Sequence, residues 1–530
     1  MKTLVTCLIL AVLSFNTNAR ELTFDQKIAD MQELSAIIKA GYGPLQYKKE
    51  TQNIDIDKLL DKYKALIKAT KNNSEFYYLM IQFVAEFNDS HFGARIPTTH
   101  NSTLGFTTDL IDGKVLIDQI DEKKLKAEDF NFKKGDEIIA IDDKTTEQIL
   151  EELIPYMGQG TKLTAKRKAA MLVSARHGSI VPVKTGESII SIKRFGSEVI
   201  EKVKLKWHVD GKALDEFVET KRNHLFHEAQ LNFDNISLIT EPAFEKSFRC
   251  SGDTRINIPE DATIIMKKPF VAYYYPTEKG NIGYLRIPHY SPSEQDPRVN
   301  AADLRFSQYE YAVSELEKNT KGLIIDQDHN CGGSVLYLHR ILTLFAKKTF
   351  AQTQFELLAT KENYLQFDSW KKSLNEYTLE HQSIEEVAEL VYKTWMETTD
   401  FLTTKIGIFG DYTFRPNHIT YTKPIIVLID ELSGSGGDAF PAMMQGLGRA
   451  KLLGTRTMGA GGHVISLPPL ANSQLKVRMT KSLFYHPNNI AIENNGASPD
   501  IKYTHTRADF MYGYKEYQKF YTEKILEEIK

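Results

Sequence analysis

The chain has 530 residues, of which 42% are hydrophobic and 25% are charged. These proportions are typical of a folded globular protein and exclude a disordered or collagen-like chain, and the length suggests roughly three or four domains. The formal net charge of -3 provides no basic surplus, so we predict no nucleic-acid partner.

Residues 1–19 are typical of a secretory signal peptide, with Lys2 as the positive start and a mostly apolar run over 4–15. That run is too short to span a bilayer comfortably, and no later segment reaches the roughly 18 consecutive apolar residues of a membrane span. We therefore expect an exported protein, periplasmic or secreted, without a stable membrane span. In an oxidising compartment Cys250 and Cys331 could form a disulfide.

The rest of the chain divides into three regions by its hydrophobic pattern, which predicts an α/β (α+β multidomain) protein. Residues 20–100 carry apolar residues at helical spacing, and residues 101–207 carry short apolar stretches between turn residues, which indicates a small β-rich module. Residues 208–530 alternate strands and helices, with a helical insertion at about 351–420. The expected core elements are strands at 281–287, 322–325 and 425–429 and helices at 335–345 and 440–447.

A turn of small residues follows the apolar strand at 425–429 and includes Ser433, Ser435 and Asp438. A serine at the start of a helix lies near free N–H groups and the positive end of the helix dipole, which favour a developing anion. Ser435 is the candidate nucleophile, and Ser433 is the alternative if the turn is shifted. A helix cap without catalysis would use the same residue types.

Several motifs resemble the C-terminal processing (tail-specific) serine peptidases, in the order of that family. The resemblance rests on the segments 322–326, 330–333, 433–438 and 448–459, and it spans most of residues 280–505. It implies the peptidase core of that family. One subclass uses a Ser–Lys dyad, but the lysine position is Ala460 here, so that dyad is absent.

The other subclass uses serine, histidine and an acid, and it includes the tricorn core protease and chlamydial protease-like activity factor. Residues 88–92 resemble its histidine segment and residues 492–500 its glutamate segment. The resemblance implies that Ser435 attacks a peptide carbonyl to form an acyl-enzyme, that His91 is the general base, and that Glu493 orients the imidazole. Without the resemblance, His91 would be an ordinary core histidine and Glu493 a solvated surface acid.

The oxyanion needs converging N–H donors, and we expect them from Gly436 and Gly332. The supporting residues around them are predicted to be Ser90, Ser433, Asn330 and Gly333. The sequence departs from the family at Asp328, where an arginine is common, so the local ion pairing differs.

Residues 104–106 and 134–142 resemble a PDZ domain, with Gly105 and Phe106 in its carboxylate-binding loop. The alternative is a structural β insertion that binds no peptide. A possible metal cluster at His224, His227 and Glu228 lacks zinc-ligand spacing, so we predict no metal and no cofactor.

The sequence therefore predicts an exported serine endopeptidase that acts on polypeptide substrates. The resemblance also suggests a zymogen and a homodimer. The main alternative is a non-catalytic protein that binds a peptide or a hydrophobic ligand on the same fold.

Overall fold

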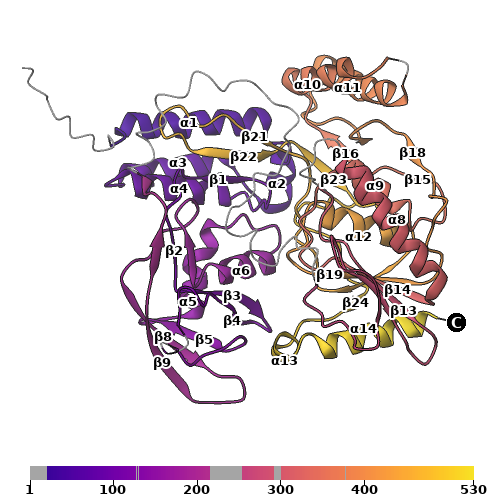
Figure 1. Cartoon of the computed structure of the whole chain (residues 1–530). Helices are drawn as coiled ribbons and strands as arrows, with labels where there is room; N and C mark the ends of the chain where they lie inside the picture. Colours follow the sequence, from indigo (N-terminus) through magenta and orange to yellow (C-terminus); the bar gives the residue numbers. More distant parts are fainter. Residues whose placement is uncertain are drawn as a thin grey trace, which may run out of the picture.

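The computed structural model describes residues 21–214 apart from 127 and 129, residues 254–291, and residues 300–529 apart from 377. An N-terminal helical region and a β-rich module lie on one side of the molecule, and an α/β core with a helical hairpin lies on the other (Figure 1). The predicted signal peptide, Cys250 and the histidine pair at 224 and 227 lie outside the described residues.

The core is built on a sheet of seven described strands in the order β11-β12-β13-β14-β19-β20-β24. Strands from β13 to β24 are parallel, and every residue of β14 and β19 is buried, as expected for the centre of a parallel sheet. The strands are β11 (Thr263–Met266), β12 (Ala272–Tyr275), β13 (Ile282–Arg286), β14 (Gly322–Asp326), β19 (Ile425–Ile429), β20 (Lys451–Gly454) and β24 (Ile501–Lys502). The helices are α8 (Ala301–Asn319), α9 (Val335–Leu342), α12 (Gly436–Gly446), α13 (Arg507–Met511) and α14 (Lys515–Glu528).

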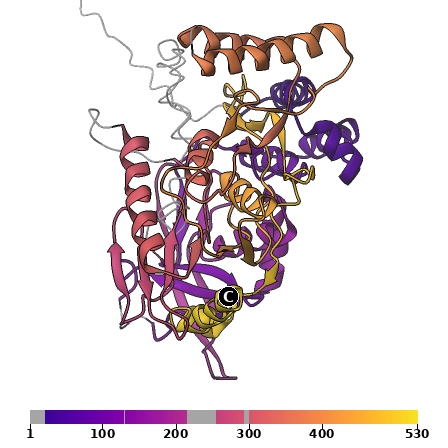
Figure 2. The ribbon, with the colours of Figure 1, turned by 90° about the vertical axis from the view of Figure 1, so that its right-hand side faces the viewer.

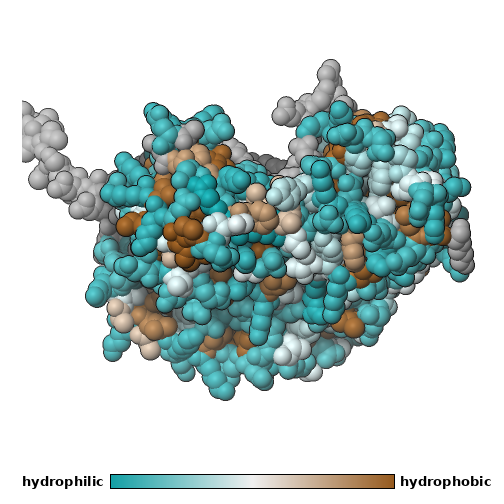
Figure 3. Space-filling model, turned by 90° about the horizontal axis from the view of Figure 1, so that it is seen from below, coloured by the Kyte–Doolittle hydropathy of each residue, from teal (hydrophilic) through white to brown (hydrophobic). Residues whose placement is uncertain are grey.

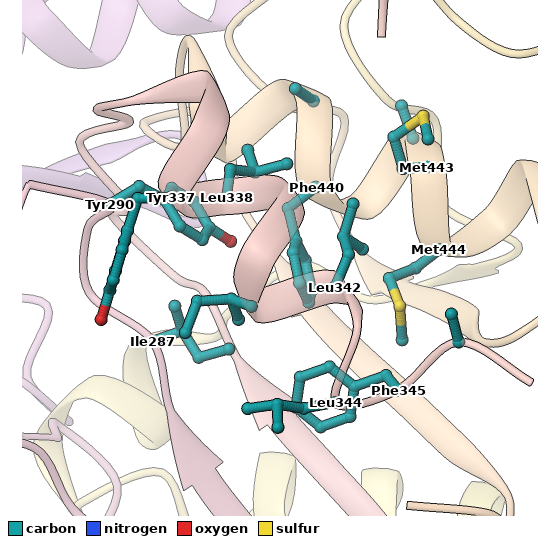
Figure 4. Close-up of a cluster of buried hydrophobic side chains, with 14 of the residues drawn as sticks. Ile287, Tyr290, Tyr337, Leu338, Leu342, Leu344, Phe345, Phe440, Met443 and Met444 are labelled. Carbon is teal, nitrogen blue, oxygen red and sulfur yellow. The ribbon is translucent and has the colours of Figure 1, made fainter. Parts of the chain in front are cut away.

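Helices α9 and α12 begin just after β14 and β19, and both helices contribute to one buried apolar cluster (Figure 4). Phe440 of α12 lies between Tyr290 and Phe345, with ring centroids 5.8 and 6.1 Å away. This packing fixes α12 against the segments that follow β13 and α9. The turn before α12 lies at the carboxyl end of β19, where ligands bind in open α/β sheets.

The N-terminal region contains α1 (Phe24–Gly41), α2 (Leu45–Gln52), α3 (Ile56–Lys68) and α4 (Asn73–Ala85), as the periodicity predicted. After α4 the chain forms β1 (Gly93–Arg95), which pairs antiparallel with β22 (Lys476–Thr480), and β22 pairs with β21 (Val464–Ser466). This pairing joins the histidine segment to a C-terminal part of the chain almost 400 residues later.

The β-rich module has a main sheet in the order β3-β4-β5-β8-β9, with β6 paired to β5. Its elements are β2 (Asn101–Thr103), β3 (Phe106–Ile111), β4 (Lys114–Ile120), β5 (Glu137–Ile141), β6 (Lys144–Thr145), α5 (Thr146–Leu153), η1 (Ile154–Tyr156), α6 (Lys162–Met171), β7 (Ala175–His177), β8 (Glu187–Lys193), β9 (Ile200–Lys206) and β10 (His208–Asp210). Arg167 of α6 is buried and binds Asp109 of the module and both Asp430 and Glu431 of the core. The module is therefore attached to the strand end that precedes the serine turn.

The expected insertion at 351–420 is helical only in its middle. Helices α10 (Lys361–Ser373) and α11 (Leu379–Glu397) form a projecting hairpin, which Figure 2 shows above the core. Short strands flank it because the ends of the insertion pair with each other and with the C-terminal part: β15 (Phe350–Ala351), β16 (Gln354–Leu357), β17 (Ile406–Gly407), β18 (Thr413–Phe414) and β23 (Ser482–Tyr485).

Across the described residues, no helix has the length and apolar character needed to cross a membrane. Seen from below, the surface is mostly hydrophilic, with small hydrophobic areas that are separate from one another (Figure 3).

Candidate active site

Ser435 precedes α12 at the end of the turn that follows β19, and it is partly exposed among buried neighbours. Its backbone φ of 58° lies in the left-handed region, which a non-glycine residue rarely adopts unless the surroundings impose it. Such strained turns occur at active sites, where they project a nucleophile from the backbone.

The Asp438 carboxyl holds this turn from inside the protein. It accepts hydrogen bonds from the Ser435 amide at 2.8 Å, the Gly459 amide at 2.8 Å, the Ala460 amide at 3.0 Å and the Thr457 hydroxyl. Burial raises the pKa of Asp438 to about 7, although all four of these bonds favour the anion. Asp438 therefore ties the nucleophile turn to the loop at 457–461, which we call the linking loop.

We predict that Asp438→Asn destabilises the protein by about 1–3 kcal/mol, because an amide cannot accept all four bonds. Since burial raises the pKa of Asp438 from 3.8 to about 7, the native state keeps a proton that the unfolded state has released. The contribution of Asp438 to the free energy of unfolding thus falls as pH rises from about 4 to 7, and the variant should lack this component. Urea unfolding of both proteins at several pH values tests this, and an identical pH dependence would contradict it.

The loop after β14 lies directly against the serine turn. The Asn330 carbonyl accepts from the Gly434 amide at 3.0 Å, and the Asn330 side-chain amide donates to Ile287 O at 2.7 Å. A Cβ on Gly332 would lie 2.6 Å from the Ser435 Cβ, so only glycine fits beside the nucleophile. Asn330 and Gly332 thus lie beside the serine turn, and Gly333 follows them with a φ of 137°.

In this conformation the amide of Gly332 already has a partner within its own loop. The Gly332 amide donates to Asn330 Oδ1 at 2.8 Å, so in this conformation it is not directed at an oxyanion. A short side chain that bonds to the backbone two residues on is a common turn, and the diglycine pattern does not reveal it. The Gly436 amide, at the start of α12, remains a candidate donor to the oxyanion.

His91 is placed by a turn at the end of α4. Asp89 Oδ1 accepts from the His91 amide at 2.7 Å and from the Phe92 amide at 3.2 Å, and Arg478 Nε donates to His91 O at 3.0 Å. The imidazole Nδ1 lies 3.4 Å from the Gly461 carbonyl oxygen. Burial lowers the pKa of His91 to about 4, and Asp89 opposes this effect while Arg478 adds to it. The imidazole is therefore neutral near pH 7.

Glu493 is completely buried and does not bind His91 directly. Its Oε2 accepts from the Gly461 amide at 3.0 Å, and its Oε1 pairs with the fully buried Lys48 of α2. Burial, and then Asp89, raises the pKa of Glu493 to about 8, against the opposing effect of Lys48. Lys48 also donates to Asn494 Oδ1 and, at 3.2 Å, to Asn88 O, so it joins the histidine and glutamate segments.

Lys48 could not be predicted from the sequence, because a lysine in an N-terminal helix carries no motif. Gly461 was also missed. The Gly461 carbonyl oxygen lies 3.4 Å from the imidazole Nδ1 of His91, and the Gly461 amide donates to the Glu493 carboxyl. A Cβ on Gly461 would lie 2.8 Å from the Glu493 amide nitrogen. The linking loop therefore contacts all three parts of the site, through Asp438, Glu493 and His91. Within the described residues, Ser435 and His91 share no hydrogen bond.

The two remaining serines occupy supporting positions. Ser433 is fully buried, with its Oγ 2.7 Å from Gln327 O and 2.9 Å from Asp430 Oδ1, which favours Ser435 over Ser433 as the nucleophile. Ser90 Oγ lies 3.3 Å from both Gly158 O and Lys168 Nζ.

The predicted peptide-binding loop of the module makes hydrogen bonds to other residues of the module. The Leu104 amide donates to Ser174 O at 2.9 Å and the Gly105 amide donates to Thr103 Oγ1 at 3.0 Å, while Phe106 is 2% exposed. The Thr108 hydroxyl donates to Ala170 O at 2.7 Å, directly between β3 and the end of α6. Gly105 and Phe106 are therefore held by contacts within the module, and peptide binding at this loop stays a prediction.

At Asp328, where the family commonly has an arginine, the nearby positive charge comes from another strand. Asp326 pairs with Arg286 of β13 at 3.0 Å, and burial raises the pKa of Asp328 well above its usual value, with Asp326 adding to the effect.

Cys331, beside the oxyanion loop, is disulfide-bonded. No group of three or more potential metal ligands occurs in the part of the chain that the structure describes.

Residues 281–503 match peptidase family S41, and residues 100–219 match a PDZ domain. The chain therefore carries the domain of a serine-type peptidase, a hydrolase, and the recognition of the C-terminal processing peptidases is confirmed. The predicted fold, with its PDZ domain and N-terminal helical region, is confirmed as well.

Individual relatives and solved structures are also similar to this chain. An uncharacterized protein of Chlamydia muridarum is 24% identical over 564 residues, which cover 94% of this chain and 92% of that protein. The carboxy-terminal-processing protease of Bartonella bacilliformis is 27% identical over 172 residues, which cover 32% of this chain and 38% of that protein. The structure of mature CPAF complexed with lactacystin matches with a TM-score of 0.81 at 23% identity, covering 96% of this chain and 99% of that chain. CPAF is chlamydial protease-like activity factor, whose fold this chain shares.

Proposed function

We propose that this protein is an exported serine endopeptidase that cleaves polypeptides through Ser435 and an acyl-enzyme. Ser435 Oγ attacks the peptide carbonyl while its proton passes to His91, and the proton then goes to the leaving amine. Water hydrolyses the acyl-enzyme by the same route. The observation that carries the proposal is the linking loop, which binds the serine turn through Asp438 and the imidazole through Gly461.

The tautomer of His91 fits the role of a base. A carbonyl oxygen can only accept, so Nδ1 carries the hydrogen toward Gly461 O and Nε2 is left as the proton acceptor. The pKa of about 4, which burial causes, keeps the imidazole neutral and ready to accept, although it makes a weaker base. Substrate binding must bring Nε2 and Ser435 Oγ into contact.

The proposed role of Glu493 is to hold the imidazole indirectly. Its carboxyl binds the Gly461 amide, and the Gly461 carbonyl receives Nδ1–H. The tetrahedral oxyanion would be bound by the Gly436 amide, and also by the Gly332 amide once its hydrogen bond to Asn330 Oδ1 breaks.

Export is supported by the apolar run at 4–15 and by the disulfide at Cys331, which suits an oxidising compartment. A homodimer and a zymogen remain predictions from the resemblance.

The rate of covalent labelling by a fluorophosphonate serine reagent tests the Ser–His pairing. We expect the His91→Gln variant of the full chain to react about 10²- to 10⁴-fold more slowly than the unmodified protein, because no general base accepts the serine proton. His463→Gln is a suitable control, since His463 is bound to Ser482 nearby and has no proposed role in proton transfer. Equal labelling of the His91→Gln variant and the unmodified chain would refute the role of His91.

A further inference from the structure

Asp89 lies two residues before His91 and is completely buried. Its Oδ1 accepts from the His91 amide at 2.7 Å and from the Phe92 amide at 3.2 Å. In turns of this kind an aspartate side chain binds the backbone two residues further on, and the bond fixes the path of the chain. Asp89 therefore sets the backbone position of the proposed general base.

The second carboxyl oxygen of Asp89 is bound by two hydroxyl groups. Oδ2 accepts from the Tyr42 hydroxyl at 2.9 Å, at the end of α1, and from the Thr480 hydroxyl at 2.7 Å, at the end of β22. Tyr42 stays a donor, because burial, and then Asp89, raises the pKa of its hydroxyl well above the usual value. All four partners of Asp89 are thus neutral donors, and within the described residues no lysine or arginine is bonded to its carboxylate.

The other buried acid of the site, Glu493, has a different environment. It pairs with Lys48, and burial, followed by Asp89, raises the pKa of Glu493 to about 8, so this carboxyl is largely protonated near pH 7. Among charged groups, Asp89 has the largest effect on the pKa of His91, and it raises that pKa. Of the two acids, Asp89 is therefore the one suited to stabilise a positively charged imidazolium.

We propose that Asp89 is a positioning residue for His91, which holds its backbone and supplies the negative charge that stabilises the imidazolium formed when Ser435 loses its proton. The inference rests on the proposed function, since only a histidine that takes up a proton needs this charge. The charge acts through space in a buried site, so Asp89 needs no contact with the ring. The role of the acid in a Ser–His–acid site is then divided, with Glu493 holding the linking loop and Asp89 balancing the charge.

The test separates the charge of Asp89 from its hydrogen bonds. In Asp89→Asn the Oδ1 can keep both amide bonds, and the new amide group can donate to the hydroxyls of Tyr42 and Thr480, because a hydroxyl can also accept. A peptide boronate added to the full chain forms a tetrahedral adduct on Ser435. Nitrogen NMR of isotope-labelled histidine then follows the protonation of His91 in the adduct, and the spectrum of His91→Gln identifies its signal.

We expect His91 to titrate about 1–3 pH units lower in Asp89→Asn than in the unmodified chain, because a nearby opposite charge has been lost. Fluorophosphonate labelling should be slower by about 10- to 100-fold, since the imidazolium is less stable. If Asp89→Asn does not fold, Asp89→Ser also removes the charge, and a serine hydroxyl can still accept from the His91 amide in this kind of turn.

Tyr42→Phe is the matched control, because it removes one hydrogen bond to Asp89 and keeps the charge. In this variant His91 should titrate close to its value in the unmodified chain. An unchanged titration of His91 in a folded charge-free variant would overturn the proposal, and so would an equal decrease in Tyr42→Phe, which would indicate a purely structural role. Failure of the proposed function would appear separately, as the absence of a boronate adduct on Ser435 of the unmodified chain.

Discussion

Replacing Ser435 by alanine is expected to lower kcat for peptide hydrolysis by roughly 10⁴- to 10⁶-fold, because no acyl-enzyme can form. Ser435 is the partly exposed serine of its turn, with a φ of 58° that directs it out of the packed core. The measurement is casein cleavage by the purified mature protein, followed by peptide release over time, with thermal unfolding to show that the variant is folded.

Ser433→Ala is the informative comparison. Ser433 is buried and bound to Gln327 O and Asp430, so its loss should reduce stability by about 1–2 kcal/mol while leaving kcat within an order of magnitude. If Ser433→Ala abolishes cleavage and Ser435→Ala does not, the nucleophile has been assigned to the wrong residue.

Replacing Lys48 by methionine should have the second largest effect. Lys48 is fully buried and joins Glu493, Asn494 and Asn88, so its removal frees the two segments that carry the base and the acid. We expect kcat to fall about 10²-fold, since small displacements of catalytic groups cost rates of this order. The KM should change little, because the Lys48 side chain is fully buried and cannot contact the substrate.

The stability defect of Lys48→Met should depend on pH. The folded pKa of Glu493, which burial raises from 4.5 to about 8, would rise further without Lys48. In the unmodified chain the contribution of Glu493 to the free energy of unfolding falls as pH rises from about 4.5 to 8, and in the variant this fall continues to higher pH. The difference between the two proteins therefore grows by about 1.4 kcal/mol per pH unit above pH 8 and is small near pH 6.

Two further variants sharpen this result. Glu493→Gln in the Lys48→Met background should remove the pH dependence, because no buried acid remains without its partner. Lys481→Met is a matched control, since Lys481 is also buried but pairs with the exposed Glu362. A defect of Lys48→Met that is constant from pH 6 to 9, or equal to that of Lys481→Met, would contradict the role of the Lys48–Glu493 pair.

The sequence predicted the elements of the core well, because buried parallel strands are continuous apolar runs with small residues at their ends. The strand at 425–429 coincides with β19, and the turn that follows it carries Ser435 as expected. Motif order also predicted that Asn330, Gly332 and Ser435 meet, because both loops follow adjacent parallel strands.

The remaining features depend on contacts between distant segments, which no local pattern encodes. Lys48 meets Glu493 across 445 residues, and Gly461 meets His91 across 370. The bond from the Gly332 amide to Asn330 is local but competes with the expected oxyanion role, and nothing in the diglycine pattern decides between the two. Within the PDZ module, the bond from the Thr108 hydroxyl to Ala170 O likewise depends on the way α6 packs against β3.

The most direct test of the account is the site of covalent attachment of a fluorophosphonate reagent, determined by peptide mass spectrometry of the mature protein. We predict one adduct on Ser435, formed rapidly in the unmodified chain and much more slowly in the His91→Gln variant. An adduct on Ser433, or none on an intact folded chain, would contradict it.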